Sequence, residues 1–242
     1  MSRRIFVFAV LFATTSLAAG PRRRAVVHQP IVPSIDHVFL VVLENADESV
    51  AEDEPYFHSL AKAGALLENY HGVAHPSQPN YIALAAGSAW GVKDDTPVTI
   101  NVPHLGDLVE SRGLTWKVYA ENYPGDCFLG ASNGTVAGGQ YVRRHVPFIE
   151  FADVQNDPQR CAEHIVDASQ LDADVASGSL PNFSFYVPND QHNGHDSSAA
   201  IADAWLQSRF TPLLANPQFT TGTLLVAGQQ DETAPLISGI WR

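Results

Sequence analysis

The sequence is poor in cysteine and in positive charge, and it has no long apolar run after its N-terminus. Two cysteines among 242 residues are too few for a disulfide scaffold, so the fold must rest mainly on its apolar core. Acidic residues outnumber basic ones by 26 to 14, and no basic stripe follows the N-terminus. Duplex nucleic acid is therefore not an expected partner. No later segment offers the roughly 20 apolar residues of a membrane span. The remaining composition, 45% hydrophobic with no internal repeat, predicts one packed domain.

The N-terminus has the pattern of an export signal. Arg3 and Arg4 are followed by an apolar stretch over residues 5–13 and a small-x-small site at residues 16–18. We expect a signal peptide over 1–18, a proline-punctuated lead-in over 19–34, and a single domain over 35–242. The apolar stretch is too short for a stable membrane anchor. Export to the periplasm or the medium places the two cysteines, Cys127 and Cys161, in an oxidising compartment, where they could form a structural bridge.

Strand-like and helix-like segments alternate along the rest of the chain. Strands are expected at 35–43, 65–70, 114–119, 182–187 and 223–227, and helices at 53–63, 78–86, 104–111 and 198–214. Residues 121–147 are rich in turn residues and show no period, which is typical of a long functional or surface excursion. The alternation predicts an α/β fold with a mostly parallel central sheet and helices on both faces.

Four of the expected strands are followed by polar clusters. These clusters are Glu44-Asn45, residues 75–80 (HPSQPN), residues 189–196 (NDQHNGHD) and Asp231-Glu232. Ligand sites of parallel sheets gather at the carboxyl ends of the strands, so we expect the four clusters to meet there. Each cluster alone is also typical of an ordinary turn. Their oxygen atoms suit a divalent metal ion, and His192 and His195 could bind the same ion or a bound anion.

Ser77 lies where the second of these clusters meets an expected helix. Free N–H groups at a helix N-terminus attract a phosphate-like anion, and a nearby metal would make the Ser77 hydroxyl a better nucleophile. The alternative interpretation is an ordinary N-cap worth about 1 kcal/mol. Arg143 and Arg144, beside His145, could contact a phosphate or form a solvated basic turn.

At this point the sequence resembles the phosphoesterases that include secreted acid phosphatases and bacterial phospholipases C, within the alkaline phosphatase superfamily. The resemblance runs from residue 35 to residue 232 and is most specific at residues 75–81 (HPSQPNY). Supporting segments are Glu44-Asn45, residues 141–148 (YVRRHVPF), residues 194–196 (GHD) and Asp231-Glu232. The chain has Asn193 where relatives tend to have Asp before Gly-His-Asp.

The resemblance implies a three-layer αβα sandwich, alkaline-phosphatase-like, and a divalent metal ion as cofactor. It implies that Ser77 is the nucleophile and a metal ligand, and that His145 and His195 contact the phosphoryl group. The other implied metal ligands are Glu44, Asn45, Asp231 and Glu232. We further expect Arg144, His192 and Asn80 to contact a small phosphorylated substrate, of which a phosphoinositide is one example. Relatives continue well past the final acidic pair, so the domain is expected to be truncated at its C-terminus.

The leading hypothesis is an exported, metal-dependent phosphomonoesterase that forms a phosphoserine. The first alternative is a phosphodiesterase of the phospholipase C type, and the second is a non-catalytic remnant that keeps the main strands. A sulfatase-like or phosphotransferase activity ranks lower, because Ser77 lies outside any cysteine-based sulfatase signature.

Overall fold

A computed structural model describes residues 35–44, 48–67, 70–134, 137–220, 223–229 and 236–238. These residues belong to the second of two compact units, which spans residues 35–242. The expected signal peptide and lead-in lie outside the described residues. Within the described ranges, no helix is both long enough and apolar enough to cross a bilayer.

The central sheet contains five strands in the order β4-β3-β5-β1-β6, and every neighbouring pair is parallel. The strands are β1 (Val38–Glu44), β3 (Trp116–Ala120), β4 (Ile165–Asp167), β5 (Phe183–Val187) and β6 (Thr223–Gln229). Strand β1 lies between β5 and β6, with Val38 opposite both Phe183 and Thr223. A continuous apolar run is typical of a strand covered on both faces, and β1 confirms this prediction.

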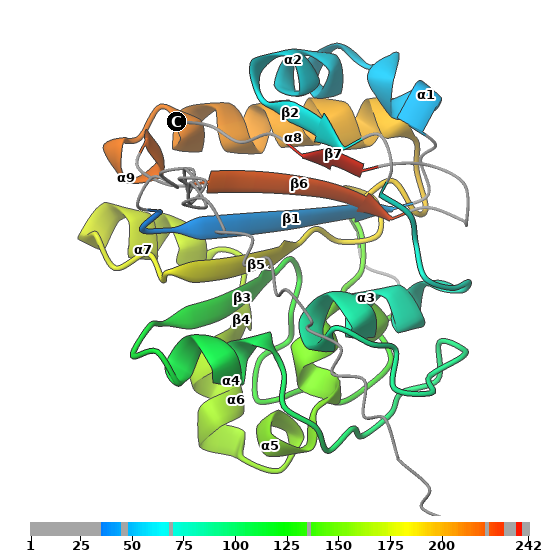
Figure 1. The fold of residues 1–242 in the computed structure, drawn as a ribbon, viewed down its shortest axis with the longest axis vertical. Coiled ribbons are helices and arrows are strands. Elements are labelled where there is room, and N and C mark those ends of the chain that lie inside the picture. The colour runs from blue at the N-terminus through cyan, green and yellow to red at the C-terminus, as the bar shows by residue number, and fades with distance from the viewer. Residues whose placement is uncertain are drawn as a thin grey trace, which may run out of the picture. The chain divides into compact units, whose positions relative to one another are not determined.

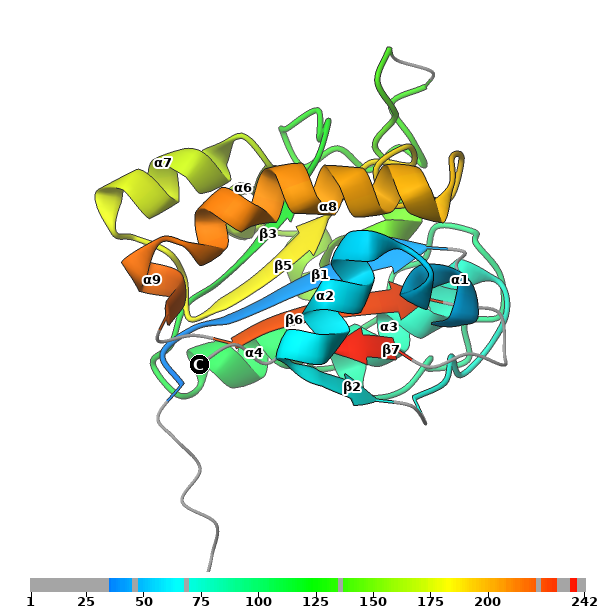
Figure 2. The ribbon, with the colours of Figure 1, turned by 90° about the horizontal axis from the view of Figure 1, so that it is seen from above.

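Helices cover both faces of this sheet, as Figures 1 and 2 show. One face packs against α2 (Pro55–Ala63), α7 (Gln170–Ser177) and α8 (Ala199–Leu214); the other packs against α3 (Ser77–Ala86), α4 (Leu105–Glu110), α5 (Ala152–Gln155) and α6 (Pro158–His164). Alternation along β1 divides the two cores, because Phe39 and Val41 join the first and Val42 joins the second. The predicted α/β class with a parallel sheet is confirmed.

Short helices α1 (Glu48–Glu52) and α9 (Pro217–Thr220) and the 3₁₀ turns η1 (Arg143–His145) and η2 (Pro147–Glu150) complete the helical elements. Two helix boundaries follow local sequence signals. Ser198 caps α8 by accepting a hydrogen bond from Ile201 N–H, and Gly87 ends α3 with φ +70°. The excursion over 121–147 carries turns and η1, and a Cys127–Cys161 disulfide ties it to α6.

The prediction for residues 65–70 is wrong in one respect. Strand β2 (Ala65–Leu67) pairs antiparallel with β7 (Leu236–Ser238) in a separate two-stranded sheet, so it does not enter the central one. Ala65 and Leu67 are exposed. A strand in the middle of a parallel sheet is covered on both faces, and a three-residue strand with two exposed side chains does not meet that condition. Strand β4 and the helices α1, α5, α6, α7 and α9 were not predicted from the sequence.

Candidate active site

The site begins with a buried carboxylate, Glu44, at the carboxyl end of β1. Its side chain is only 1% exposed, and Oε2 accepts a hydrogen bond from Ser77 Oγ at 3.2 Å. Burial raises the pKa of Glu44 to about 7, and contacts with Tyr81 and Ser77 and the nearby His195 and Arg144 only partly oppose this. A carboxylate in such surroundings lacks the compensation that buried charges normally receive.

Ser77 reaches Glu44 from the first turn of α3. The helix begins at Ser77 itself, with Pro76 at the N-cap position, rather than after an N-capping Ser77. Pro76 has no side-chain group with which to cap the helix. The Ser77 hydroxyl is thus aimed across the strand end at Glu44 instead of back at its own helix.

His145 lies against the other oxygen of the same carboxylate. Its Nε2 is 3.3 Å from Glu44 Oε1, and its Nδ1 is 3.3 Å from Asn193 Nδ2. The Asn193 amide is oriented by His195 N–H, which donates to Asn193 Oδ1 at 2.7 Å. With its amide nitrogen facing Nδ1, Asn193 favours the tautomer that carries its proton on Nε2. Burial, with the nearby Arg144 and His195, holds the pKa of His145 well below its usual range.

His195 and Arg144 border the site from two different loops. Arg144 Nη2 is 3.4 Å from His195 Nε2, and His195 Nδ1 is 2.5 Å from Asp196 Oδ1. The neighbouring Arg143 has a different role, because its guanidinium donates to Glu150 Oε2 at 2.9 Å and to the carbonyl oxygen of Leu129. The two arginines thus have different partners, and Arg144, the one expected to contact substrate, is the one beside His195.

Two of the expected substrate contacts have other partners. Asn80 accepts hydrogen bonds from Val73 N–H and Ala74 N–H at 2.7 and 3.0 Å, and its amide donates to the Ala74 carbonyl oxygen. It therefore orders the loop that leads to Ser77. His192 stacks on Trp205 on the α8 face of the sheet and lines a separate pocket of about 360 Å³. Neither residue has a described contact with Glu44 or Ser77.

Three of the expected metal ligands, Asn45, Asp231 and Glu232, lie outside the described residues. Glu44 Oε1 is buried and makes no hydrogen bond to any described residue, although His145 Nε2 is at ion-pair distance. An oxygen atom with this unused capacity fits a ligand of a hard divalent ion.

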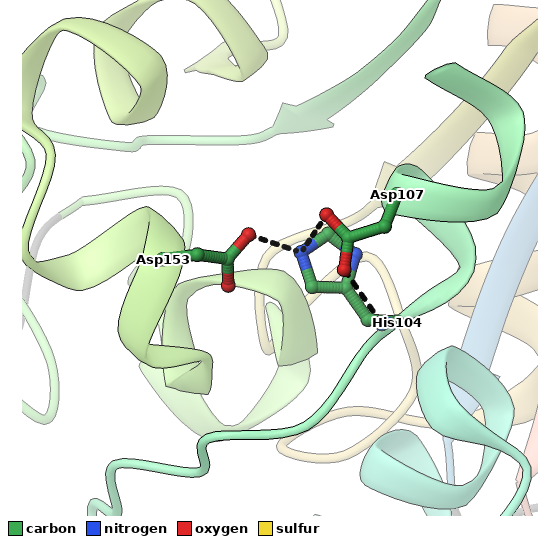
Figure 3. A group of neighbouring side chains, drawn as sticks. All are labelled: His104, Asp107 and Asp153. Carbon is green, nitrogen blue, oxygen red and sulfur yellow. Dashed lines mark hydrogen bonds and ion pairs between the residues drawn. The ribbon is translucent and has the colours of Figure 1, made fainter. Parts of the chain in front are cut away.

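A second group of side chains also has ligand atoms close enough to hold an ion, namely His104, Asp107 and Asp153 (Figure 3). However, His104 Nδ1 accepts a hydrogen bond from Gly106 N–H at 3.0 Å, which leaves the proton on Nε2, 3.2 Å from Asp153 Oδ2. Arg160 lies 2.8 Å from Asp107 and 3.3 Å from Asp153. The nitrogen that would bind an ion is therefore protonated and the carboxylates are already paired, which indicates a structural network.

Two residues at the site received no role from sequence reasoning. Tyr81 stacks on His145 with ring centroids 5.0 Å apart, and Asp95 contacts the first turn of α3. Asn193 belongs to the predicted cluster over residues 189–196, and the structure adds its contact with His145. The spacing of Ser77 and Tyr81, four residues apart on one helix face, was the available signal for Tyr81. Asp95 follows α3 in a loop without periodicity, so no local pattern identifies it.

Comparisons with known proteins identify the family that this chain resembles. The model of the Phosphoesterase family matches residues 49–232. A "Probable acid phosphatase" of Kluyveromyces lactis is 34% identical over 200 residues, which cover 81% of this chain and 47% of that protein. A "Phosphate-repressible acid phosphatase" of Penicillium chrysogenum is 33% identical, covering 80% and 47%. A "Phosphatidylinositol-3-phosphatase" of Mycobacterium tuberculosis is 35% identical, covering 81% and 63%. The chain spans about half the length of most of the curated relatives it matches.

Proposed function

The chain belongs to the Phosphoesterase family, and we propose that it is an exported, metal-dependent phosphomonoesterase with Ser77 as its nucleophile. The observation that carries the proposal is the 3.2 Å contact between Ser77 Oγ and the buried Glu44 carboxylate. A hydroxyl at a helix N-terminus beside an under-bonded carboxylate combines a nucleophile, a metal ligand and a place for an anion. The relatives named acid phosphatases support this reaction class.

The proposed reaction has two displacements at phosphorus. Ser77 Oγ loses its proton and attacks phosphorus while the bond to the ester oxygen breaks, and the leaving oxygen takes up a proton and departs as the alcohol. Water then attacks the phosphoserine; as the bond from phosphorus to Oγ breaks, one proton of the water restores the Ser77 hydroxyl, and phosphate is released. We propose that His145, His195 and Arg144 contact the phosphoryl oxygens; the contact of His195 with Asp196 and the approach of Arg144 to His195 support this for His195 and Arg144.

The metal would be held by Glu44 and Ser77 together with Asn45, Asp231 and Glu232. When bound, a divalent ion lowers the pKa of a coordinated hydroxyl and stabilises charge on the phosphoryl oxygens. The contacts of Asn80 and His192 point away from substrate binding, so we assign that role to Arg144 alone among the three residues expected to have it. The disulfide is consistent with export to an oxidising compartment.

The proposed substrates are small phosphate monoesters. A relative named for a phosphatidylinositol phosphate makes phosphoinositides a reasonable second class to assay. The phospholipase C alternative predicts faster cleavage of a diester, and the remnant alternative predicts no cleavage.

The test compares p-nitrophenyl phosphate with bis(p-nitrophenyl) phosphate, each with chelator and with added divalent metal. We expect monoester hydrolysis that chelation abolishes and metal restores. The variant Ser77→Ala should lose at least about a thousandfold in kcat, while Ser111→Ala, an exposed serine at the end of α4, should retain activity. Turnover by a folded Ser77→Ala protein would disprove the nucleophile assignment, and no turnover by folded wild type would favour the remnant.

A further inference from the structure

We infer that Asp95 is a positioning residue that sets Arg144 against the first turn of α3, so that the arginine faces the place of the transferred phosphoryl group. This inference rests on the proposed function. Asp95 Oδ1 accepts a hydrogen bond from Gln78 N–H at 3.0 Å, and Asp95 Oδ2 is 3.5 Å from Arg144 Nε. One carboxylate thus joins the residue after the nucleophile to the arginine beside His195.

The contact between Asp95 and Gln78 N–H takes the place of an N-cap at the start of α3. The first N–H groups of a helix have no intrahelical acceptors, and side chains such as Asp or Ser at the N-cap position usually accept from them. Pro76 occupies that position in α3 and makes no side-chain cap. Asp95, which is 17 residues away from Gln78 in sequence, accepts from Gln78 N–H instead.

The loop that carries Asp95 is fixed to the helix by a second contact. Gln78 is fully buried, and its side-chain amide donates to the Thr96 carbonyl oxygen at 2.8 Å. Asp94 steadies the same turn by accepting from Thr96 N–H at 2.9 Å. Asp95 is therefore held relative to Ser77 by backbone and side-chain contacts, and its second oxygen has a defined position from which to orient a cation.

Arg144 is the cation that this oxygen orients. Its Nε lies 3.5 Å from Asp95 Oδ2, at ion-pair distance and without a hydrogen bond to any described residue, and its Nη2 lies 3.4 Å from His195 Nε2. Contact through Nε leaves the outer guanidinium nitrogens available to phosphoryl oxygens, in the fork geometry that arginine uses for phosphate. The pairing also neutralises Asp95, whose charge at the helix N-terminus would otherwise repel a phosphate.

The substitution Asp95→Asn separates the two contacts. An amide oxygen can still accept from Gln78 N–H, but a neutral amide no longer attracts Arg144, and its NH₂ group faces another donor. We expect kcat/KM for p-nitrophenyl phosphate to fall by about tenfold or more, because small errors in the placement of a binding group are costly. Inhibition by inorganic phosphate should weaken in parallel. Asp94→Asn makes the same charge change one residue earlier and keeps a side-chain oxygen that can accept from Thr96 N–H, so its kcat/KM should stay within about twofold of wild type.

A double-mutant cycle tests whether Asp95 acts through Arg144. If it does, Asp95→Asn combined with Arg144→Ala should be no slower than Arg144→Ala alone. If the fold-losses of the two single variants in kcat/KM instead multiply in the double variant, the inference is overturned. An unchanged kcat/KM and an unchanged inhibition constant for phosphate in Asp95→Asn would also overturn it. Thermal unfolding of each variant controls for loss of fold.

A readout without turnover keeps the inference separate from the proposed function. The ¹⁵N–¹H signal of Arg144 Nε, assigned with Arg144→Lys, should shift in Asp95→Asn and stay in place in Asp94→Asn. If wild type hydrolyses no ester yet the signal shifts, the proposed function fails and the positioning contact stands. If wild type is active and the signal does not move, the positioning inference fails alone.

Discussion

Two glutamates on the carboxyl edge of the central sheet have opposite surroundings. Glu44 ends β1, and Glu121 directly follows β3, with β5 between the two strands. Glu121 accepts four hydrogen bonds: from Tyr186 Oη and Trp205 Nε1 on one oxygen, and from Asn189 N–H and His192 Nδ1 on the other. Glu44 is the more deeply buried of the two; among the described residues it accepts a hydrogen bond from Ser77 and is contacted by Tyr81 and His145.

The difference shows that two carboxylates at the same edge of the sheet can have different roles, one structural and one in ligand binding. A carboxylate whose lone pairs are filled by protein donors holds those donors in place, and it has no capacity for anything else. A buried carboxylate with an unpaired oxygen is unstable by itself and gains from a cation. We therefore interpret Glu121 as the anchor of the loop over residues 188–198 and Glu44 as a ligand.

The largest effect on activity is expected from Glu44→Gln, which tests whether Glu44 is a metal ligand. Losing the charge should remove the cation site and lower kcat by at least about a thousandfold. Thermal melts with and without a divalent metal provide the second measurement. Wild type should gain about 2.7 kcal/mol at a hundredfold excess of metal over its Kd, and Glu44→Gln should gain nothing.

The matched control for that substitution is Glu163→Gln, at a glutamate of α6 that pairs only with Gln159 in the described structure. It should leave both turnover and the metal-dependent melt unchanged. If added metal still stabilises Glu44→Gln, the ion binds elsewhere. Glu44 would then not be a ligand, and the proposed difference in role between Glu44 and Glu121 would not hold.

The converse result is expected from Glu121→Gln. An amide can accept on one side only, so at least two of the four donors would face an NH₂ group. Since hydrogen bonds to a charged, poorly exposed group are worth more than neutral ones, the free energy of unfolding should fall by about 2 kcal/mol. Urea denaturation measures this, and Glu163→Gln again serves as control. Activity should fall less than tenfold; a thousandfold loss without destabilisation would make Glu121 a site residue instead.

Sequence reasoning predicted the features that depend on local pattern or on motif. The apolar run of β1, the helix that begins near residue 198 and the α/β alternation each follow from residues close in the chain. The grouping of Glu44, Ser77, His145, His195 and Arg144 followed from strand-end placement and the family resemblance, and the structure brings all five together.

What the sequence could not provide are side-chain contacts between distant segments. His192 and His195 are three residues apart in one polar cluster, yet they serve different faces of the sheet, because the loop after β5 turns between them. Likewise Asp95 meets Gln78 only after the loop beyond α3 folds back. The pairing of β2 with β7 joins segments about 170 residues apart, and no turn signal predicts such a register.

The smallest effect is expected at Asp174, on the α8 face of the sheet. Like Glu121, its carboxylate accepts hydrogen bonds from several protein donors, so we expect it to hold those donors in place. Asp174 of α7 accepts from Lys117 Nζ and Tyr119 Oη, each at 2.6 Å, and from Gln170 Nε2 at 3.0 Å. Burial raises its pKa, but these hydrogen bonds outweigh burial and leave the pKa below its usual value of 3.8. A carboxyl group whose pKa is lowered by folding stabilises the folded state above the unfolded pKa, and this contribution disappears as the pH falls through the folded value.

Asp174→Asn should therefore cost about 1 kcal/mol of unfolding free energy at pH 6, and less as the pH is lowered towards 3. Urea denaturation of wild type and variant across this range measures the difference, with Asp172→Asn, at a more exposed carboxylate of the same helix, as control. A difference that stays constant with pH would mean that packing rather than charge explains the loss. A gap that closes as the pH falls would show that the ionised Asp174 anchors its three donors, as we infer for Glu121, and would leave the under-bonded Glu44 as the exception that calls for a ligand.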